Sequence, residues 1–364
     1  MNGRSGNGRY APAAVVWTAF FILSIFGVLT IASSQSFAVR PLALAIRQSG
    51  HMLIGAAALF VASRLPFSFY RRNAVMLTAG ALTVLLLLPW FGIRINGMSG
   101  WFNFFGITVQ PSEFFKPVAL LSFVALMMSL HGETNRFFGG LVLALLWVIP
   151  ILIQPDFGTA AIYMGIFAIV YFLAGGWWRW LVALVGTGAA GVGIFLWSHP
   201  YALRRLTGFL DPESDPLGNG WHIRQFELAI ARGGWFGSKL GGAVWSNAYL
   251  PFAYNDSAFA TMAETLGFFG VLIPAAVLAA LVAALVVLGH TPRLAESARL
   301  YILGAASLLV MQTLIHISVN LGLLPPTGLT LPLISYGGSS FVSCGIMLGI
   351  ALSASRDNRE EARA

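Results

Sequence analysis

The chain has 364 residues, of which 57% are hydrophobic and only 9% charged, and its mean hydropathy is +0.79. Soluble globular domains carry about 25% charged residues, so this composition excludes a water-soluble enzyme and indicates an integral membrane protein. A formal net charge of +8 would suggest nucleic-acid binding in a soluble chain. In a membrane protein basic cytoplasmic loops explain it, and we predict no nucleic-acid partner.

About ten apolar segments are long enough to cross a bilayer, which needs about 20 residues per helix. They cover residues 13–33, 46–64, 74–92, 114–131, 137–154, 158–175, 178–198, 258–289, 299–322 and 334–354. We predict an all-α polytopic membrane protein, a single domain over residues 1–364, with a large extracytoplasmic loop at 199–256 between spans seven and eight. The eighth segment is over-long and contains Gly267 and Gly270, so it is expected to begin as an aqueous or interfacial helix.

The distribution of cations predicts the orientation of the chain. An even number of spans puts both termini on one side, and the loops on that side hold most of the arginines, which places the termini in the cytoplasm. The loop at 199–256 then lies outside, although it carries five cations: Arg204, Arg205, Arg224, Arg232 and Lys239. An anionic substrate would explain this departure from the rule.

Acidic residues at the span boundaries are functional candidates, because a charge at membrane depth costs at least about 2.5–3.5 kcal/mol. Of the 13 acidic residues, four lie there: Glu113, Asp156, Asp256 and Glu264. Glu113 and Lys116 are three residues apart and can pair on one helix face. That pair can be purely structural, or Lys116 can bind an anionic head group, and the two interpretations are compatible.

Two of these acids stand before predicted helices. Asp156 lies in a tight turn and is expected to be the N-cap of the sixth span. Asp256 could be an N-cap too, or a catalytic base. Glu264 lies eight residues further on, about 12 Å along a helix, which is too far for a tight carboxylate pair. The pattern left is one base that deprotonates an attacking hydroxyl, with cations that stabilise a departing diphosphate.

Other polar features of the loop carry weaker signals. His222 has no second His or Cys at ligand spacing, so it is expected to be an ordinary polar residue, and no metal site is predicted. The glycines between residues 233 and 242 lack the Gly-Lys-Ser/Thr of a nucleotide loop. They are expected to form a flexible surface loop that lets the backbone approach a substrate. The lone Cys344 is interpreted as a packing residue.

Four stretches in chain order resemble one known family. Gln110–Lys116 resembles the motif Q-P-S-E-x-x-K, and Gln154–Thr159 resembles Q-P-D-x-G-T. The third stretch, from Arg204 to Pro212 and then from Gly220 to Gly234, resembles the family's large extracytoplasmic loop. The fourth, Pro325–Ser340, resembles P-x-T-G…L-P-x-I-S-Y-G-G-S-S, the most specific of the set. Together they resemble the SEDS (shape, elongation, division and sporulation) family, which includes FtsW, RodA and SpoVE.

The resemblance implies a function and a site. Such proteins are peptidoglycan glycosyltransferases of the bacterial cytoplasmic membrane. They polymerise lipid II, release undecaprenyl diphosphate and work with a class B penicillin-binding protein in elongation, division or sporulation. Asp256 stands where the family has its essential aspartate, so it is the predicted catalytic residue. The predicted substrate-binding residues are Lys116, Glu113, Arg204, Arg205, Arg224, Gln225, Glu264, Ser335 and Ser339. A divalent cation could assist the diphosphate.

The chain also departs from the family pattern. Asn96–Trp101 lacks the usual arginine, Gly237–Gly241 stands where G-x-G-x-G is expected, His222 replaces a common glutamine, and Thr265 replaces a second glutamate. Two alternatives therefore stay open: a transporter of the lipid-linked precursor, and a non-catalytic scaffold that activates a penicillin-binding protein.

Overall fold

The structure is a computed structural model that describes residues 7–36, 40–95, 98–104, 107–198, 207, 209–213, 220–250 and 252–357. Helix is present in every one of the predicted segments, so the helical fold class is confirmed. The helices are α1 (Asn7–Ser34), α2 (Ala43–Arg64), α3 (Phe67–Arg72), α4 (Ala74–Phe91), α5 (Pro111–Phe114), α6 (Lys116–Ser129), α7 (Glu133–Ile153), α8 (Phe157–Leu173), α9 (Trp178–Ser198), α11 (Trp221–Gly233), α12 (Val244–Ala248), α13 (Ala258–Gly289), α14 (Glu296–Asn320) and α15 (Gly338–Ala354).

Six of the described helices are long and apolar enough to cross a membrane: α1, α2, α4, α7, α13 and α14. Three shorter apolar helices accompany them, namely α6, α8 and α15. With α9, these helices lie at the positions of the predicted spans. The chain is therefore a multi-pass membrane protein, while the count of ten crossings stays a prediction.

The fourth predicted span differs from its expected form. Segment 114–131 is divided at Phe115 into α5 and α6, and Pro117 falls in the first turn of α6. Proline has no N–H to donate to the carbonyl four residues back, so a continuous helix through residue 117 is interrupted. Before α5 stands a small antiparallel sheet that we did not predict, in the order β1 (Ile93–Ile95), β2 (Met98–Phe104) and β3 (Ile107–Val109).

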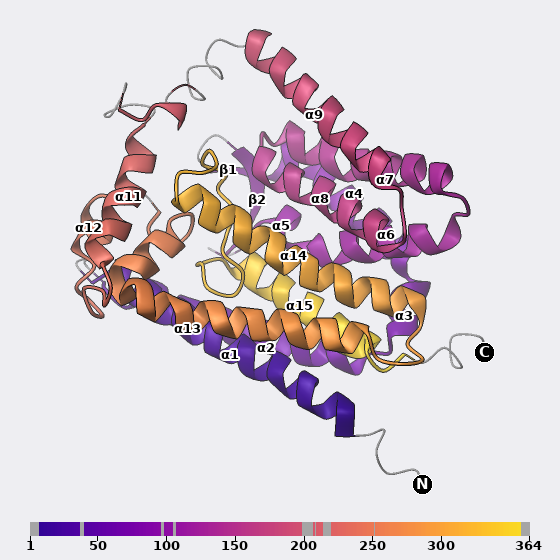
Figure 1. Ribbon diagram of the computed structural model, residues 1–364, viewed down its shortest axis with the longest axis horizontal. Helices are drawn as coiled ribbons and strands as arrows, with labels where there is room; N and C mark the ends of the chain where they lie inside the picture. Colours follow the sequence, from indigo (N-terminus) through magenta and orange to yellow (C-terminus); the bar gives the residue numbers. More distant parts are fainter. Residues whose placement is uncertain are drawn as a thin grey trace.

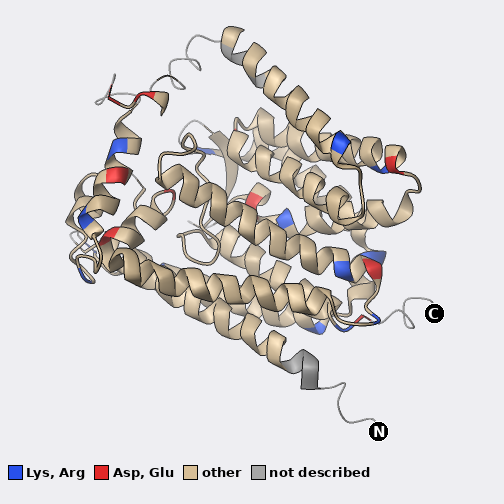
Figure 2. Ribbon diagram, viewed as in Figure 1, with Lys and Arg blue, Asp and Glu red and all other residues tan. Residues whose placement is uncertain are grey.

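The helices form a bundle whose two ends differ (Figure 1). The start of α1, the short α3 and the end of α15 lie at one end, and α11 and α12 lie at the opposite end. Charged residues gather at the helix ends and connections, with few inside the bundle (Figure 2). This is the expected pattern for a protein in lipid, where a charged side chain is expensive unless it is paired.

Large aromatic side chains fill the interior, and Trp147, Tyr163, Tyr171 and Tyr301 are fully buried. The Trp147 indole donates to the Ser122 hydroxyl at 3.2 Å, so its polar N–H is satisfied inside the bundle. This packing fixes α6, α7 and α8 against one another. The Tyr163 hydroxyl donates to the Ser112 carbonyl at 2.7 Å, which joins α8 to α5.

Candidate functional site

The turn Tyr254–Asp256, which leads into α13, is held by its backbone. The first of its three carbonyl oxygens accepts a hydrogen bond from the Tyr336 backbone N–H at 2.8 Å. The second accepts from the Ser335 hydroxyl at 2.9 Å. The third accepts from the Asn320 side-chain amide at 3.0 Å. Three successive carbonyls are thus fixed by groups from α14 and from the loop before α15.

The same region supplies the cap of α13. The N-cap residue is Ser257, which makes no side-chain cap hydrogen bond to the helix. The amide of residue 259 donates to His316 Nε2 at 3.4 Å, and the amide of residue 260 donates to Asn320 Oδ1 at 3.1 Å. The alternative in which Asp256 is only a helix cap is therefore wrong, because side chains of α14 fill that role.

The Asp256 side chain is left half-buried, and none of the described residues makes a hydrogen bond to its carboxylate. One of its oxygens lies 3.9 Å from the position that a Cβ would take at Gly328, so the carboxylate faces the loop before α15. Burial, together with the smaller effect of the negative charge of Asp156, raises the pKa of Asp256 to about 6. A carboxyl of that pKa is mostly ionised at neutral pH and is a stronger base than an ordinary aspartate.

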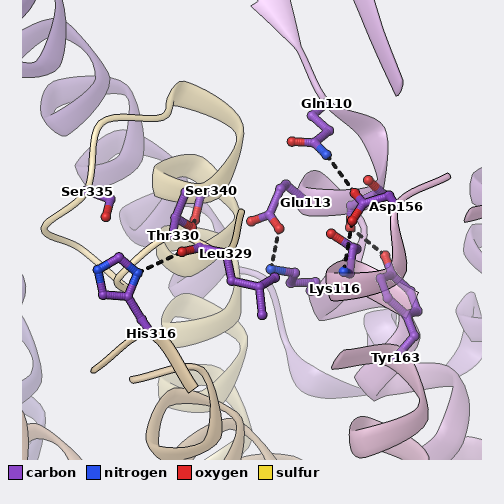
Figure 3. A network of polar contacts seen from close by, with 12 residues as sticks. Gln110, Glu113, Lys116, Asp156, Tyr163, His316, Leu329, Thr330, Ser335 and Ser340 are labelled. Carbon is purple, nitrogen blue, oxygen red and sulfur yellow. Dashed lines mark hydrogen bonds and ion pairs between the residues drawn. The ribbon is translucent and has the colours of Figure 1, made fainter. Parts of the chain in front are cut away.

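Asp156 is bound on both oxygens. Oδ1 accepts from the backbone N–H of Thr159 at 3.0 Å, which confirms the predicted N-cap of α8. Oδ2 accepts from the Gln110 side-chain amide at 3.1 Å (Figure 3). Burial raises the pKa of Asp156, and the charge of Glu113 adds to that shift, while the Thr159 hydrogen bonds and Lys116 oppose it. Asp156 is thus a structural acid, and it lies close enough to Asp256 for its negative charge to raise the pKa of Asp256.

Glu113 and Lys116 form the predicted ion pair. Lys116 Nζ lies 2.6 Å from Glu113 Oε1, and both side chains are buried (Figure 3). The other oxygen of Glu113 has no hydrogen-bond partner among the described residues. A buried pair of this kind must be kept together, because loss of one partner leaves an uncompensated charge. Head-group binding by Lys116 stays a prediction.

The loop Pro325–Ser340 joins these groups. The Ser339 hydroxyl accepts from the Gln110 backbone N–H at 2.8 Å, so the start of α5 meets the start of α15. The backbone of the loop also approaches the start of α8 closely, since a Cβ added at Gly158 would lie 2.4 Å from the Thr327 carbonyl oxygen. His316 Nε2 accepts a hydrogen bond, so its Nδ1 carries the proton and donates to the Leu329 carbonyl at 2.7 Å (Figure 3). Segments 110–116, 154–159, 252–258 and 325–340 therefore converge on one site.

Known proteins share this architecture. The model of the FtsW/RodA/SpoVE family, described as "Cell cycle protein", matches residues 13–360. The chain belongs to this family. It is 34% identical to a probable peptidoglycan glycosyltransferase FtsW of Pseudomonas fluorescens, over 91% of this chain and 84% of that protein. It is 33% identical to the protein of the same name in Legionella pneumophila, over 94% and 90%.

Two solved structures are similar along nearly the whole chain. One belongs to a peptidoglycan synthase complex that coordinates polymerisation and crosslinking, with a TM-score of 0.78, 30% identity, and 94% and 97% of the two chains covered. The other is the rod-shape-determining protein RodA of Thermus thermophilus, with a TM-score of 0.70, 28% identity, and 94% and 96% covered. The membrane fold of the FtsW/RodA/SpoVE family is thus common to all three.

Among the described residues, the Glu264 carboxylate contacts α11 and α12, not the four segments that converge near Asp256. Its carboxylate accepts from the Trp245 backbone N–H at 2.9 Å and from the backbone N–H and hydroxyl of Ser246 at 2.7 and 2.5 Å. Arg232 lies 3.9 Å away. These contacts engage both oxygens and fix the start of α12, so the position of Glu264 is that of a structural acid. A contact with substrate stays a prediction.

In the part of the chain that the structure describes, no hydrogen bond or ion pair joins Arg224 or Gln225 to the four converging segments. Arg224 is exposed on α11, whereas the neighbouring Gln225 is buried and its Oε1 has no hydrogen-bond partner among the described residues. Arg204 and Arg205 lie outside the described residues. Within the described part of the chain no group of three or more His, Cys, Asp or Glu could hold a metal ion. The divalent cation therefore stays a prediction without ligands assigned to it.

Sequence reasoning missed several residues that position the site, above all His316 and Asn320. Their signal was available: they are four residues apart on one face of a predicted span, and polar side chains inside a span are functional candidates. Gln110 and Asp156 were recognised as parts of motifs, but neither their mutual hydrogen bond nor the effect of Asp156 on Asp256 was foreseen. Only the fold brings these segments together.

Proposed function

We propose that this chain is a peptidoglycan glycosyltransferase that polymerises lipid II, with Asp256 as its general base. The observation that carries the proposal is the state of the Asp256 carboxylate. Its backbone is fixed at successive carbonyls, yet the carboxylate itself has no hydrogen-bond partner among the described residues and carries a raised pKa. A structural acid would be bound, as Asp156 is. The names of the relatives from Pseudomonas and Legionella support the same reaction.

The reaction is a transfer between two lipid-linked sugars. A sugar hydroxyl of the acceptor attacks the anomeric carbon of the donor, and the new glycosidic C–O bond forms as the bond to the diphosphate oxygen breaks. The leaving undecaprenyl diphosphate takes the electron pair, and Asp256 takes the proton of the attacking hydroxyl. A diphosphate is a good leaving group, so one base suffices and Glu264 need not serve as an acid.

Cations stabilise the departing diphosphate in this scheme. Lys116 is the buried candidate, although its ammonium already pairs with Glu113. Arg224 and Arg232 are exposed on α11 and are candidates for diphosphate or for a partner protein. Arg204 and Arg205 keep the same assignment from the sequence. Ser335 and Ser339 already bond to the backbone of residues 255 and 110, so we assign them a positioning role beside substrate binding.

The setting follows from the same proposal. The end of the bundle that carries α11 and α12 faces outward from the bacterial inner membrane, and both termini are cytoplasmic. Lipid II arrives in the outer leaflet, so the base at the start of α13 lies on the side where the substrate is. A class B penicillin-binding protein is the proposed partner, and the similar chain from a peptidoglycan synthase complex that coordinates polymerisation and crosslinking supports a crosslinking partner of this kind.

The test is polymerisation of purified lipid II by the reconstituted chain, with and without the penicillin-binding protein. Asp256→Ala should abolish polymer formation while the protein still folds. Glu296→Ala is a matched control, because this acid is partly exposed and pairs loosely with Arg299 at 3.8 Å. Full polymerisation by Asp256→Ala would refute the assignment. Normal growth of cells carrying Asp256→Asn would favour the scaffold alternative.

A further inference from the structure

Helix α13 is interrupted at Gly267, where the backbone has φ 70° and ψ −178°. The turn at residues 233–238, which follows α11 and which we call the hairpin, fills the interruption. The amides of Phe268 and Phe269 donate to the carbonyls of residues 234 and 235 at 2.9 and 3.2 Å, in place of carbonyls one turn earlier in the helix. In return, the Glu264 carbonyl accepts from the backbone N–H of residue 238 at 2.9 Å. The hairpin thus caps both halves of a broken helix.

Glycine is required at this junction. A Cβ at Gly237 would lie 2.3 Å from the Thr265 carbonyl oxygen, and one at Gly267 would lie 2.2 Å from the backbone nitrogen of residue 237. Both residues also have positive φ values, of 76° and 70°, which glycine adopts without strain. The glycines at 237 and 267 therefore let the backbone of the loop contact the backbone of α13, while an approach of the loop to substrate stays a prediction.

The two halves of α13 have different surroundings. Residues 260–265 are all buried in protein, and they include the polar Thr261 and Glu264. From Phe268 onward the helix exposes apolar side chains, among them Leu272 and Ile273. A helix that belongs to a membrane protein and exposes only apolar groups faces lipid there. Gly267 separates a protein-enclosed half from a lipid-facing half.

The tip of the hairpin extends the lipid-facing half. Trp235 and Phe236 are 64% and 81% exposed, the reverse of what water would favour for such side chains. Trp235 packs on Phe268 and Phe269 with ring centroids 5.5 and 5.6 Å apart, and Phe236 packs on Phe269 at 5.6 Å. The four rings form one continuous exposed surface, which we call the aromatic surface.

We propose that the aromatic surface is a membrane-interface anchor, with the lipid of the leaflet at the α11–α12 end as its occupant. Trp concentrates at the boundary between head groups and acyl chains, and Trp and Phe together form the apolar face of segments that lie in that boundary. The surface is continuous with the lipid-facing side of α13, and the hairpin that bears it is hydrogen-bonded into that helix. The anchor fixes the point at which α13 enters lipid. The half before Gly267 lies outside the hydrocarbon, which sharpens the expected interfacial start of this span.

Spin-label accessibility in the full chain tests the anchor. The native thiol is removed by Cys344→Ala, and single cysteines are introduced by Phe236→Cys, by Leu272→Cys as a lipid-facing control and by Arg224→Cys as a water-facing control on α11. Each protein is labelled with a nitroxide and reconstituted in vesicles of phosphatidylethanolamine and phosphatidylglycerol. Collisions with oxygen report lipid, and collisions with a water-soluble nickel chelate report water.

The label at residue 236 should favour oxygen over the nickel chelate, as at residue 272 and opposite to residue 224. Because position 236 is highly exposed, the substitution should leave the fold intact, which unchanged thermal unfolding would verify. A label at residue 236 that the nickel chelate reaches as readily as at residue 224 would overturn the proposal. Shielding of that label from both reagents only after a membrane-anchored partner protein is added would instead identify a protein interface, and would overturn it equally.

Discussion

Two turns of this protein carry an aspartate just before a helix, and they use it differently. In the turn Gln154–Thr159, the carboxylate caps α8 and is bound on both oxygens. In the turn before α13, the corresponding cap comes from His316 and Asn320, and the carboxylate of Asp256 makes no hydrogen bond to the described residues. A local pattern that predicts a cap in both places therefore yields one structural acid and one acid available for chemistry. The difference arises because α14 supplies the two side chains that cap α13, so the Asp256 carboxylate is not needed as a cap.

The largest expected effect is a difference in polymerisation activity between a substitution at Asp256 and the same substitution at Asp156. Asp256→Asn should lower lipid II polymerisation by about 10²–10⁴-fold, the usual contribution of a general base. Stability should not fall, since the substitution removes a half-buried charge without a hydrogen-bond partner among the described residues. Polymer yield over time and thermal unfolding in detergent measure both. Asp156→Asn should keep most of the activity, and a comparable loss in that variant would erase the contrast.

The next effect tests the cap that frees Asp256. Asn320→Leu removes the donor to the carbonyl of residue 256 and the acceptor for the amide of residue 260. Each buried group left without a partner costs about 1–3 kcal/mol, so the free energy of unfolding should fall by that order. The rate constant of polymerisation should fall more than the affinity for lipid II, because the base is displaced.

A control lies on the same helix. Thr313 is buried, and its hydroxyl has no hydrogen-bond partner among the described residues, so Thr313→Val should change little. Equal destabilisation by Thr313→Val and Asn320→Leu would show that the effect belongs to α14 packing and not to the cap.

A smaller effect concerns the cap of α8. Asp156→Ala removes the acceptor for the Thr159 amide and should lower the free energy of unfolding by about 1 kcal/mol, the usual value of an N-cap. Asp156→Asn should lose less, because asparagine caps helices nearly as well. Thermal unfolding of the three proteins under one condition measures the order. An alanine variant as stable as the wild type would mean that the cap contributes nothing.

The smallest effect is a shift in pH dependence. The base works deprotonated, so activity should be low in acid and rise as pH increases through about 6, the pKa of Asp256. Asp156→Asn removes a negative charge that holds this pKa up, so the acid limb should move to lower pH while the cap is kept. Initial rates of polymerisation from pH 4.5 to 8 measure the acid limb of the wild type and of the variant. A shift to higher pH would contradict the proposed coupling of the two carboxylates.

Much of the fold was predictable from the sequence. The lengths of the apolar segments located the helices, and the predicted Glu113–Lys116 pair and the Asp156 cap depend only on neighbours within a turn, so both were found. The small sheet after α4 was missed because its strands are short and lie between two apolar helices. Glu264 was assigned to substrate from its place in a motif, whereas its observed partners are 18 and 19 residues away.

The sequence by itself determined the membrane class, the positions of the helices and the identity of Asp256 as the residue to test. Those features depend on composition, on local spacing and on resemblance along the chain. Only the tertiary structure decided that the Asp256 carboxylate has no hydrogen-bond partner among the described residues while Asp156 is bound on both oxygens, because the groups that fix the turn before α13 come from positions 60 and more residues away. Hydrogen bonds of that separation leave no periodic pattern in a sequence, so only the folded chain distinguishes the carboxylate that is bound from the one that we propose as the base.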